Sequence, residues 1–451
     1  MTNPGDDRCP GLSTQDIITT DMHPAGAPLD QVSYRFLGDK DIPFERHTSS
    51  EFFNREVERM WPRVWQWACR EEQLPNAGDY YVYDVARYSI VVVRTDDGEV
   101  KGYYNSCPHR GTQLKPSGSS GNTRQIRCPF HGFTWDIQGR LVNIPCRWDF
   151  PHIKDEEFTL PEVKVEVWGG FVFINLDDDA VPLKDYLGVL SEHFSGRWDL
   201  TNRYVELHVE KILPANWKTA QEAFIEAYHV LATHPQAIRI AGDANTQYDL
   251  FGQHVNRFVQ TLGFPSPHLN KEFTEEEMLG FLAGGDTALT VGKNEKARGV
   301  YAEHLRVVLG KQYQVDLSEY TDSEMIDSIE YHLFPNMFLF PGISLPMIYR
   351  FRPNGMDVDS CIFDLLFLRP NPDGRPSPKP AEPFKLGVAD SFKTVPGFNP
   401  GLAHVYDQDT ALLEMQRKGL ASSYKSGATL GNYQEVRIRH VHQTLDEYLA
   451  D

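Results

Sequence analysis

Two short loops in the first third of the chain repeat nearly the same order of residues. The first runs Cys107-Pro108-His109-Arg110-Gly111, and the second runs Cys128-Pro129-Phe130-His131-Gly132. Each loop offers one thiolate and one imidazole, and each closes on a glycine that permits a tight turn. Four such groups on two matching loops are typical of a metal centre, and holding them together constrains the fold of this region.

The order of the four ligands distinguishes two kinds of metal centre. Zinc fingers usually group a pair of Cys before a pair of His, whereas the order here is Cys, His, Cys, His. Each loop can therefore offer its Cys to one iron and its His to the other, which is the Rieske arrangement of a [2Fe-2S] cluster. We predict such a cluster, with a structural zinc site in a binding protein as the alternative.

Length and charge limit what the rest of the chain can be. At 451 residues and 41% hydrophobic content, the chain is long enough for two domains with sizeable cores. A formal net charge of −19 argues against nucleic acid or an anionic membrane as a partner. The N-terminus lacks a cationic and apolar leader, and no run of about 18 apolar residues occurs, so we expect a cytoplasmic protein without a membrane partner.

Short alternating segments separated by turn residues surround the two loops. They predict strands over 80–83, 89–94, 100–104, 125–127, 133–136 and 163–175. The apolar spacing over 49–65 predicts a helix that Pro62 ends or kinks. We therefore expect an N-terminal arm over 1–48 and a small antiparallel β domain with a leading helix over 49–178.

A second chemical stretch lies at 216–235, which we predict as one helix ended by Pro235. On a regular helix Glu222, Glu226 and His229 share a face, which is either a solvated polar face or part of a site. His229 and His234 are five residues apart, or about 140° around the axis. They share a face only if the helix breaks between them.

A third stretch, 401–422, has helical spacing with Asp409 at the head of an apolar stripe. Burying this carboxylate unpaired would be costly, so it needs either a salt bridge or a metal. Two imidazoles and one carboxylate make the facial triad of non-haem Fe(II) oxygenases.

The second half of the chain, 179–451, is predicted to form an antiparallel sheet gripped by helices. Candidate strands are 204–213, 329–333, 337–340, 347–352 and 360–368. Between the first two lies an acidic segment, 264–310, which is either a surface insertion or a lid over a substrate channel.

Together these motifs resemble the catalytic α subunit of Rieske non-haem iron oxygenases, of the aromatic-ring-hydroxylating dioxygenase type. The resemblance covers essentially the whole chain after the N-terminal arm. It implies an α+β protein with a small antiparallel β Rieske domain and a helix-grip (START/SRPBCC-like) catalytic domain. Cofactors implied are a [2Fe-2S] cluster on Cys107, His109, Cys128 and His131, and a mononuclear Fe(II) on His229, His234 and Asp409.

The resemblance also implies catalytic roles for Asn216, Tyr228 and Glu226, which lie in the stretch that matches the family's catalytic helix. One position departs from the family pattern, because Glu226 stands where an Asp is usual. By carry-over, Glu226 would link His229 to His131 of the partner subunit, with one extra methylene.

What the resemblance implies for function is a terminal oxygenase. It would receive electrons relayed from NAD(P)H by a separate reductase or ferredoxin, activate O₂, and mono- or dioxygenate an apolar aromatic or alicyclic compound. A homotrimer is implied, with or without a small β subunit. The sequence has no G-x-G-x-x-G after a strand and no Walker motif, so we do not expect this chain to bind NADH. The alternatives are an oxidative O- or N-demethylase and a Rieske electron-transfer protein without oxygenase activity.

Overall fold

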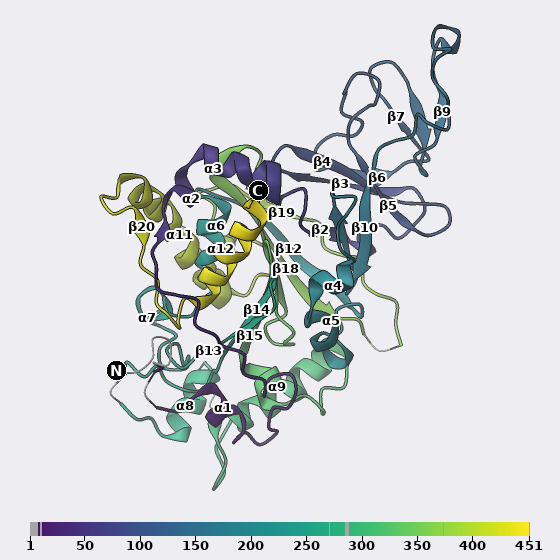
Figure 1. Cartoon of the computed structure of the whole chain (residues 1–451). Helices are drawn as coiled ribbons and strands as arrows, with labels where there is room; N and C mark the ends of the chain where they lie inside the picture. The colour runs from purple at the N-terminus through teal and green to yellow at the C-terminus, as the bar shows by residue number, and fades with distance from the viewer. Residues whose placement is uncertain (1–7, 10, 270, 285–287, 373, 451) are drawn as a thin grey trace. The chain divides into compact units, whose positions relative to one another are not determined.

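The computed structural model describes residues 8–9, 11–269, 271–284, 288–372 and 374–450. Contacts divide the chain into two compact units. The smaller unit comprises 54–186 and the short segment 353–357, and the larger comprises 1–53, 187–352 and 358–451 (Figure 1). No helix in the described ranges combines the length and the apolar character needed to cross a membrane.

The smaller unit is built from two antiparallel sheets. The seven-stranded sheet has the order β2 (Gln66–Arg70), β11 (Phe171–Asn175), β10 (Glu162–Trp168), β5 (Val100–Tyr104), β4 (Tyr88–Arg94), β3 (Asp79–Val85) and β6 (Ser120–Asn122). The three-stranded sheet has the order β7 (Gln125–Arg127), β8 (Thr134–Asp136) and β9 (Leu141–Asn143). The predicted antiparallel β character of this region is confirmed.

One expectation for this region was wrong in detail. The segment 163–175 is not one strand, because Gly169 and Gly170 adopt positive φ values of 58° and 73° and turn the chain into the β10–β11 hairpin. The helix predicted from residue 49 onward consists of α3 (Ser50–Arg55) and a π-helical turn over Glu56–Met60. It ends just before Pro62, as expected for a residue that is incompatible with a helix interior.

The larger unit is organised on one eight-stranded sheet. Its order is β13 (Gln247–Phe251), β14 (Val255–Gln260), β15 (Ser328–Leu333), β16 (Met337–Leu339), β17 (Met347–Asn354), β18 (Asp357–Pro370), β12 (Arg203–Leu213) and β19 (Phe384–Leu386). Strand β12 pairs antiparallel with β18 and parallel with β19. Five of these strands match predicted segments, while β13, β14 and β19 were missed. Buried Asp249, Asn256 and Arg257 interrupt the apolar pattern that would have identified β13 and β14.

Helices flank this sheet and carry the chemically important residues. Those that matter below are α2 (Glu45–Thr48), α6 (Trp217–Glu222), α7 (Val230–Thr233), α11 (Pro400–Ser422) and α12 (Val436–Leu449). The others in this unit are α1 (Thr14–Ile18), α5 (Leu190–His193), α8 (Glu275–Leu282), α9 (Ala297–Tyr313) and α10 (Asp322–Ile326), while α4 (Leu183–Leu187) begins in the smaller unit. Helix α12 packs on β13 and β14. The acidic run near 275 forms the first turn of α8, capped by Thr274.

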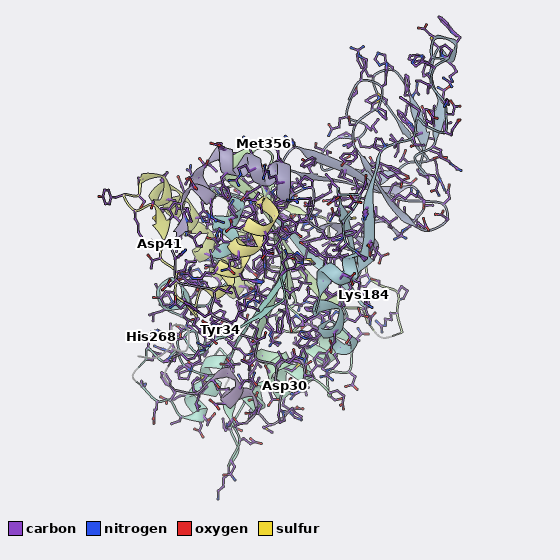
Figure 2. The ribbon with its side chains drawn as sticks, viewed as in Figure 1. Asp30, Tyr34, Asp41, Lys184, His268 and Met356 are labelled. Atoms are coloured by element: carbon purple, nitrogen blue, oxygen red, sulfur yellow. The ribbon has the colours of Figure 1, made fainter. Side chains whose placement is uncertain are left out.

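The described part of the N-terminal segment belongs to the larger unit and contacts it at several points. Figure 2 labels Tyr34 and Asp41 on this segment. The Tyr34 ring lies 5.1 Å from that of Tyr433, and Asp41 pairs with Lys425 at 2.8 Å. Two-residue strands β1 (Ile42–Pro43) and β20 (Gly427–Ala428) pair nearby. The domain boundary at residue 48 stays a prediction.

A buried ion cluster holds Asp21 of this segment against the larger unit. Arg298 of α9 is 4% exposed and donates to Asp21 and to Asp327, each at 2.7 Å. Both carboxylates are also buried. Removing the guanidinium would leave two carboxylates in the interior without their countercharge.

Replacing Arg298 with Met is therefore expected to lower the free energy of unfolding by about 3–5 kcal/mol. The control is Lys418→Met, which breaks the exposed Lys418–Glu414 pair on α11 and should cost less than about 1 kcal/mol. Urea unfolding of the full chain measures both values. Equal, small losses in the two variants would contradict the assigned role of Arg298.

Candidate metal centres

The two cysteine loops of the smaller unit have the same backbone geometry. In each, the Cys carbonyl accepts from the glycine amide, at 2.8 Å for Gly111 and 3.1 Å for Gly132. Both glycines have positive φ, 75° and 79°, a conformation that side chains disfavour. The repeat seen in the sequence is thus a repeat in three dimensions.

The four predicted cluster ligands converge from these loops. The thiols of Cys107 and Cys128 hydrogen-bond to each other, and the rings of His109 and His131 have centroids 4.8 Å apart. Nδ1 of His109 is buried and has no hydrogen-bond partner among the described residues. A buried lone pair of this kind suits a metal ligand.

Backbone amides surround the two sulfurs. The amides of His109 and Arg110 donate to the Cys107 sulfur, and those of Phe130 and His131 donate to the Cys128 sulfur. Such N–H···S bonds stabilise the thiolate form and tune the potential of an iron–sulfur cluster. This donor set fits a cluster held by two Cys on one iron and two His on the other.

The two histidines differ in their surroundings. His109 stacks on Phe133, with ring centroids 4.6 Å apart and an interplanar angle of 11°. His131 lies beside Phe130, which is 61% exposed. Both imidazoles are half-buried, but His109 lies among the rings of Phe133 and Phe150, whereas the neighbour of His131 is itself exposed.

The stretch 216–235 is not the single helix predicted from its sequence. Helix α6 ends at Glu222, and α7 covers only Val230–Thr233. His229 precedes α7, and His234 follows it with φ −121° and ψ 60°, outside helical geometry. Pro235 disfavours a helical conformation at His234. The amides of Thr233 and His234 still donate to the carbonyls of His229 and Val230, so between the two histidines the chain departs from helical geometry only at His234, and the two rings lie 5.2 Å apart.

Asp409 of α11 completes a cluster of three ligand groups. Its Oδ1 lies 3.6 Å from Nε2 of His229 and 2.8 Å from Nε2 of His234. The carboxylate is 6% exposed, and the three donor atoms lie within 4.8 Å of one another. This is the donor set of a mononuclear non-haem iron centre.

Two further side chains orient the imidazoles. Oε1 of Glu226 lies 2.8 Å from Nδ1 of His229, and Oε1 of Gln408 lies 3.0 Å from Nδ1 of His234. Each contact turns the opposite ring nitrogen, Nε2, toward Asp409. Burial alone would lower the pKa of His229, but Glu226 and Asp409 raise it to about 9, which shows that the carboxylates favour a positive charge here.

Sequence reasoning missed Gln408. It lies next to Asp409 on a helix whose partner segment is 174 residues away. A glutamine beside a carboxylate is common on solvated helix faces, so nothing in the local pattern marked it.

Two cavities of the larger unit reach this centre. One, of about 320 Å³, is bordered by both histidines and Asp409 and is otherwise mostly apolar and aromatic; its lining includes Phe224, Phe258, Phe340, Met347, Tyr349 and Tyr406. The other, of about 330 Å³, is bordered by His229 and Asp409 and carries the carboxylates Glu222, Glu226 and Glu435. The centre thus has an apolar approach and an acidic one.

Asn216 and Tyr228 are placed away from both cavities. The Asn216 side chain caps α6 by accepting from the Lys218 amide at 3.1 Å, and it donates to the Val358 carbonyl at 3.0 Å. Tyr228 is 54% exposed. Their catalytic roles stay predictions, and the contacts of Asn216 are those of a helix cap.

Two known families match separate stretches of the chain. Residues 64–154 match the Rieske [2Fe-2S] domain, and residues 194–451 match the ring hydroxylating alpha subunit (catalytic domain). The chain belongs to this ring-hydroxylating family. The predicted family, the α+β fold class and the two cofactors, a Rieske cluster and mononuclear iron, are confirmed.

Curated relatives include dioxygenases and a monooxygenase. The chain is 33% identical to the chlorobenzene dioxygenase subunit alpha of a Cupriavidus species, over 58% of this chain and 62% of the relative. It is 31% identical to the biphenyl 2,3-dioxygenase subunit alpha of Rhodococcus jostii, over 44% of each protein. It is 30% identical to the carnitine monooxygenase oxygenase subunit of Escherichia coli, over 43% of this chain and 52% of the relative. The matches thus span less than two thirds of these relatives.

Solved structures share the fold. A naphthalene 1,2-dioxygenase superposes with a TM-score of 0.63 at 18% identity, covering 94% of this chain and 95% of the other. A quaternary ammonium Rieske monooxygenase superposes with a TM-score of 0.61 at 18% identity, covering 90% and 95%.

The orientation of His234 yields a testable prediction. Gln408→Ala removes the acceptor at Nδ1 and frees the ring to rotate, so Fe(II) affinity should fall by about 10- to 100-fold. Glu414→Ala, at an exposed position of the same helix, is the matched control. Isothermal titration calorimetry with Fe(II) under nitrogen measures both affinities. Equal affinities in the two variants would contradict the role given to Gln408.

Proposed function

We propose that this chain is the terminal oxygenase of a multicomponent Rieske system that hydroxylates an apolar aromatic or alicyclic compound. The observation that carries the proposal is the position of the His229, His234 and Asp409 cluster on a mostly apolar, aromatic cavity. Three protein ligands leave coordination positions open for O₂, and the cavity offers an apolar substrate a dry place beside them.

The residues of the chain have separate roles in this proposal. Cys107, His109, Cys128 and His131 hold the cluster, and His229, His234 and Asp409 hold the mononuclear iron. When bound, the two metal centres supply electron storage and the activation of O₂. The protein groups keep both Nε2 atoms turned inward and bury the carboxylate, and apolar side chains line most of the cavity.

Substrate orientation is assigned to the apolar cavity. Phe224, Phe258 and Phe340 offer ring faces and edges to an aromatic or alicyclic body. Tyr349 and Tyr406 form a hydroxyl–hydroxyl hydrogen bond in the same lining. Their hydroxyls, together with Gln260 and Glu330 of the same lining, are polar groups next to which an oxygen or nitrogen substituent would lie.

Electron delivery is assigned to separate proteins and to the assembly. We propose that a ferredoxin or reductase relays electrons from NAD(P)H to the cluster. We also propose a homotrimer, with or without a small β subunit, in which the electron passes from the cluster of one subunit to the mononuclear iron of another. Glu226 is the proposed link from His229 to His131 of the partner subunit. Its Oε1 and Oε2 already accept from the His229 ring and amide at 2.8 and 3.0 Å, so the added methylene does not prevent the first half of this bridge.

Oxidative O- or N-demethylation is the second candidate, since it uses the same centres and starts with a monooxygenation. The similarity to a carnitine monooxygenase subunit supports demethylation as the alternative hypothesis. A substrate screen that measures formaldehyde together with hydroxylated product separates the two outcomes.

Metal analysis tests the proposal directly. Anaerobically purified protein should contain about three irons and two acid-labile sulfides per chain, with a Rieske EPR signal after reduction. Asp409→Ala should lose one iron and keep the signal, and it should abolish incorporation of ¹⁸O from ¹⁸O₂ into product.

An unchanged iron content in Asp409→Ala would contradict the oxygenase and favour an electron-transfer protein. Zinc without sulfide in the unaltered protein would contradict both the oxygenase and the electron-transfer interpretation. The control variant is Glu414→Ala on the same helix, which shows how much iron is lost during purification alone.

The role of Glu226 gives a separate prediction. Glu226→Gln keeps the shape but removes the charge, so reductase-driven turnover should fall by about 10- to 100-fold while both metal centres remain loaded. Glu226→Asp, which is the usual residue of the family, should recover part of the rate. Rapid-mixing measurements of cluster oxidation by O₂ in the presence of substrate report this step, and unchanged rates in Glu226→Gln would refute the link.

A further inference from the structure

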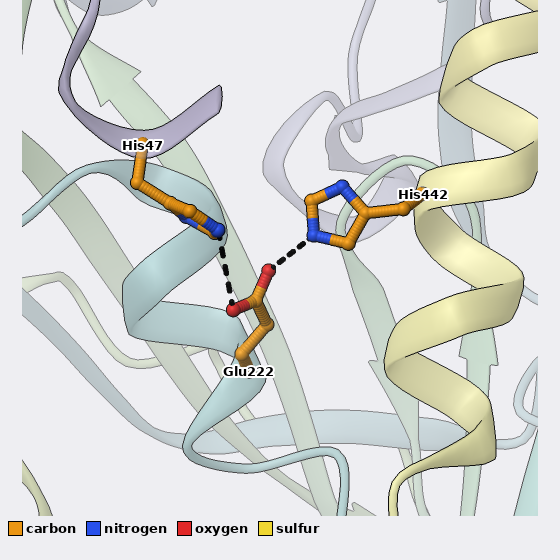
Figure 3. Close-up of side chains that lie close together, drawn as sticks. All are labelled: His47, Glu222 and His442. Atoms are coloured by element: carbon orange, nitrogen blue, oxygen red, sulfur yellow. Dashed lines mark hydrogen bonds and ion pairs between the residues drawn. The ribbon is translucent and has the colours of Figure 1, made fainter. Parts of the chain in front are cut away.

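A second cluster of metal-binding side chains lies in the larger unit, apart from the iron ligands. It consists of His47, Glu222 and His442, whose donor atoms lie within 4.8 Å of one another. Figure 3 shows the two imidazoles converging on the Glu222 carboxylate from different helices. We propose that these three residues form a second divalent metal site, for zinc or ferrous iron.

The distances suit three ligands of one ion. Oε1 of Glu222 lies 2.8 Å from Nε2 of His442, and Oε2 lies 3.8 Å from Nε2 of His47. An ion placed among these atoms would need only small side-chain movements to reach the bond lengths of about 2.0–2.2 Å that zinc makes to His and Glu. Two His and one carboxylate are a donor set used by both zinc and ferrous iron.

The ring of His47 is held in the orientation that ligation requires. Its Nδ1 lies 3.1 Å from Oγ1 of Thr219, one turn before Glu222 on α6. This contact leaves Nε2 facing Glu222. A hydrogen bond to the ring nitrogen that does not bind the metal usually fixes the orientation of a histidine ligand.

A simple ion pair explains the cluster less well. His442 is 1% exposed, and its Nδ1 is buried without a hydrogen-bond partner among the described residues. An ion pair with Glu222 would require His442 to carry a full positive charge in the interior, which is costly, whereas a metal is bound by the neutral ring.

Charges of both signs lie around the cluster. Lys218 and Arg46 act on all three residues and oppose a further positive charge. The carboxylates of Glu226, Glu435 and Asp409 line the same cavity as His47 and Glu222 and attract a cation to it. The cavity also gives the ion and its water ligands a route from solvent.

The site would join three distant parts of the chain. His47 lies on α2, Glu222 ends α6, and His442 lies on α12, 220 residues beyond Glu222. A metal here would fasten the N-terminal segment and the last helix to the helix that precedes the iron ligands. This structural role is independent of the proposed oxygenase activity.

Zinc binding by the full-length protein tests the site once the iron centre has been disabled. The parent for the test is His234→Ala/Asp409→Ala, which retains the cluster. Equilibrium dialysis against micromolar zinc, followed by elemental analysis, should find one zinc per chain. Adding Glu222→Gln should reduce zinc to the background of a protein-free control. Adding His440→Gln, a buried His two residues from His442 on the same helix, should leave it unchanged.

Two results would overturn the proposal: no bound zinc in the parent, or zinc that persists in the Glu222→Gln variant. If that variant fails to fold, X-ray absorption at the zinc edge of the parent decides. Two imidazoles with oxygen ligands at about 2.0–2.2 Å support the site. Sulfur ligands would place the zinc in the cysteine loops, and a shell of oxygen alone would show an adventitious surface ion; either would overturn the proposal.

Discussion

The catalytic unit depends on Asp409 of α11, whose carboxylate lies 3.6 Å from Nε2 of His229 and 2.8 Å from Nε2 of His234. On a regular helix these two histidines would lie about 140° apart. The chain is helical from His229 to Thr233 and leaves that geometry at His234, where the two rings lie 5.2 Å apart. The helix is interrupted earlier, between α6 and α7. The cost of interrupting backbone hydrogen bonds is offset in part by side chains, since Glu226 accepts from the His229 amide at 3.0 Å.

What could be predicted from sequence was the chemistry that is local along the chain. Each cysteine loop contains its own two ligands, its turn glycine and its amide donors, so the motif carried nearly the whole geometry. Strands β4 and β5 and helix α11 also followed from their apolar spacing. Pro235 correctly marked the end of the helical stretch, but the earlier break after Glu222 had no comparable signal.

What could not be predicted depends on contacts between distant segments. Gln408 orients His234 across 174 residues, and His47 meets Glu222 and His442 only after three helices have packed. The polar interior of β13 and β14 is explained the same way, since Arg257 is buried against Asp249 and the N-terminal segment. A buried charge looks like a surface residue until its partner is known.

The two metal centres differ in how firmly their ligands are held, and the difference suits their tasks. Around Cys107 and Cys128 the supporting donors are backbone amides of tight turns, which cannot rotate, so a cluster there would change little when an electron arrives. Around His229 and His234 the supports are the side chains of Glu226 and Gln408, and both residues lie beside cavities or solvent. In the oxygenase proposed above, such supports would let the ligands move when substrate and O₂ enter, a freedom that a cluster which only passes electrons does not need.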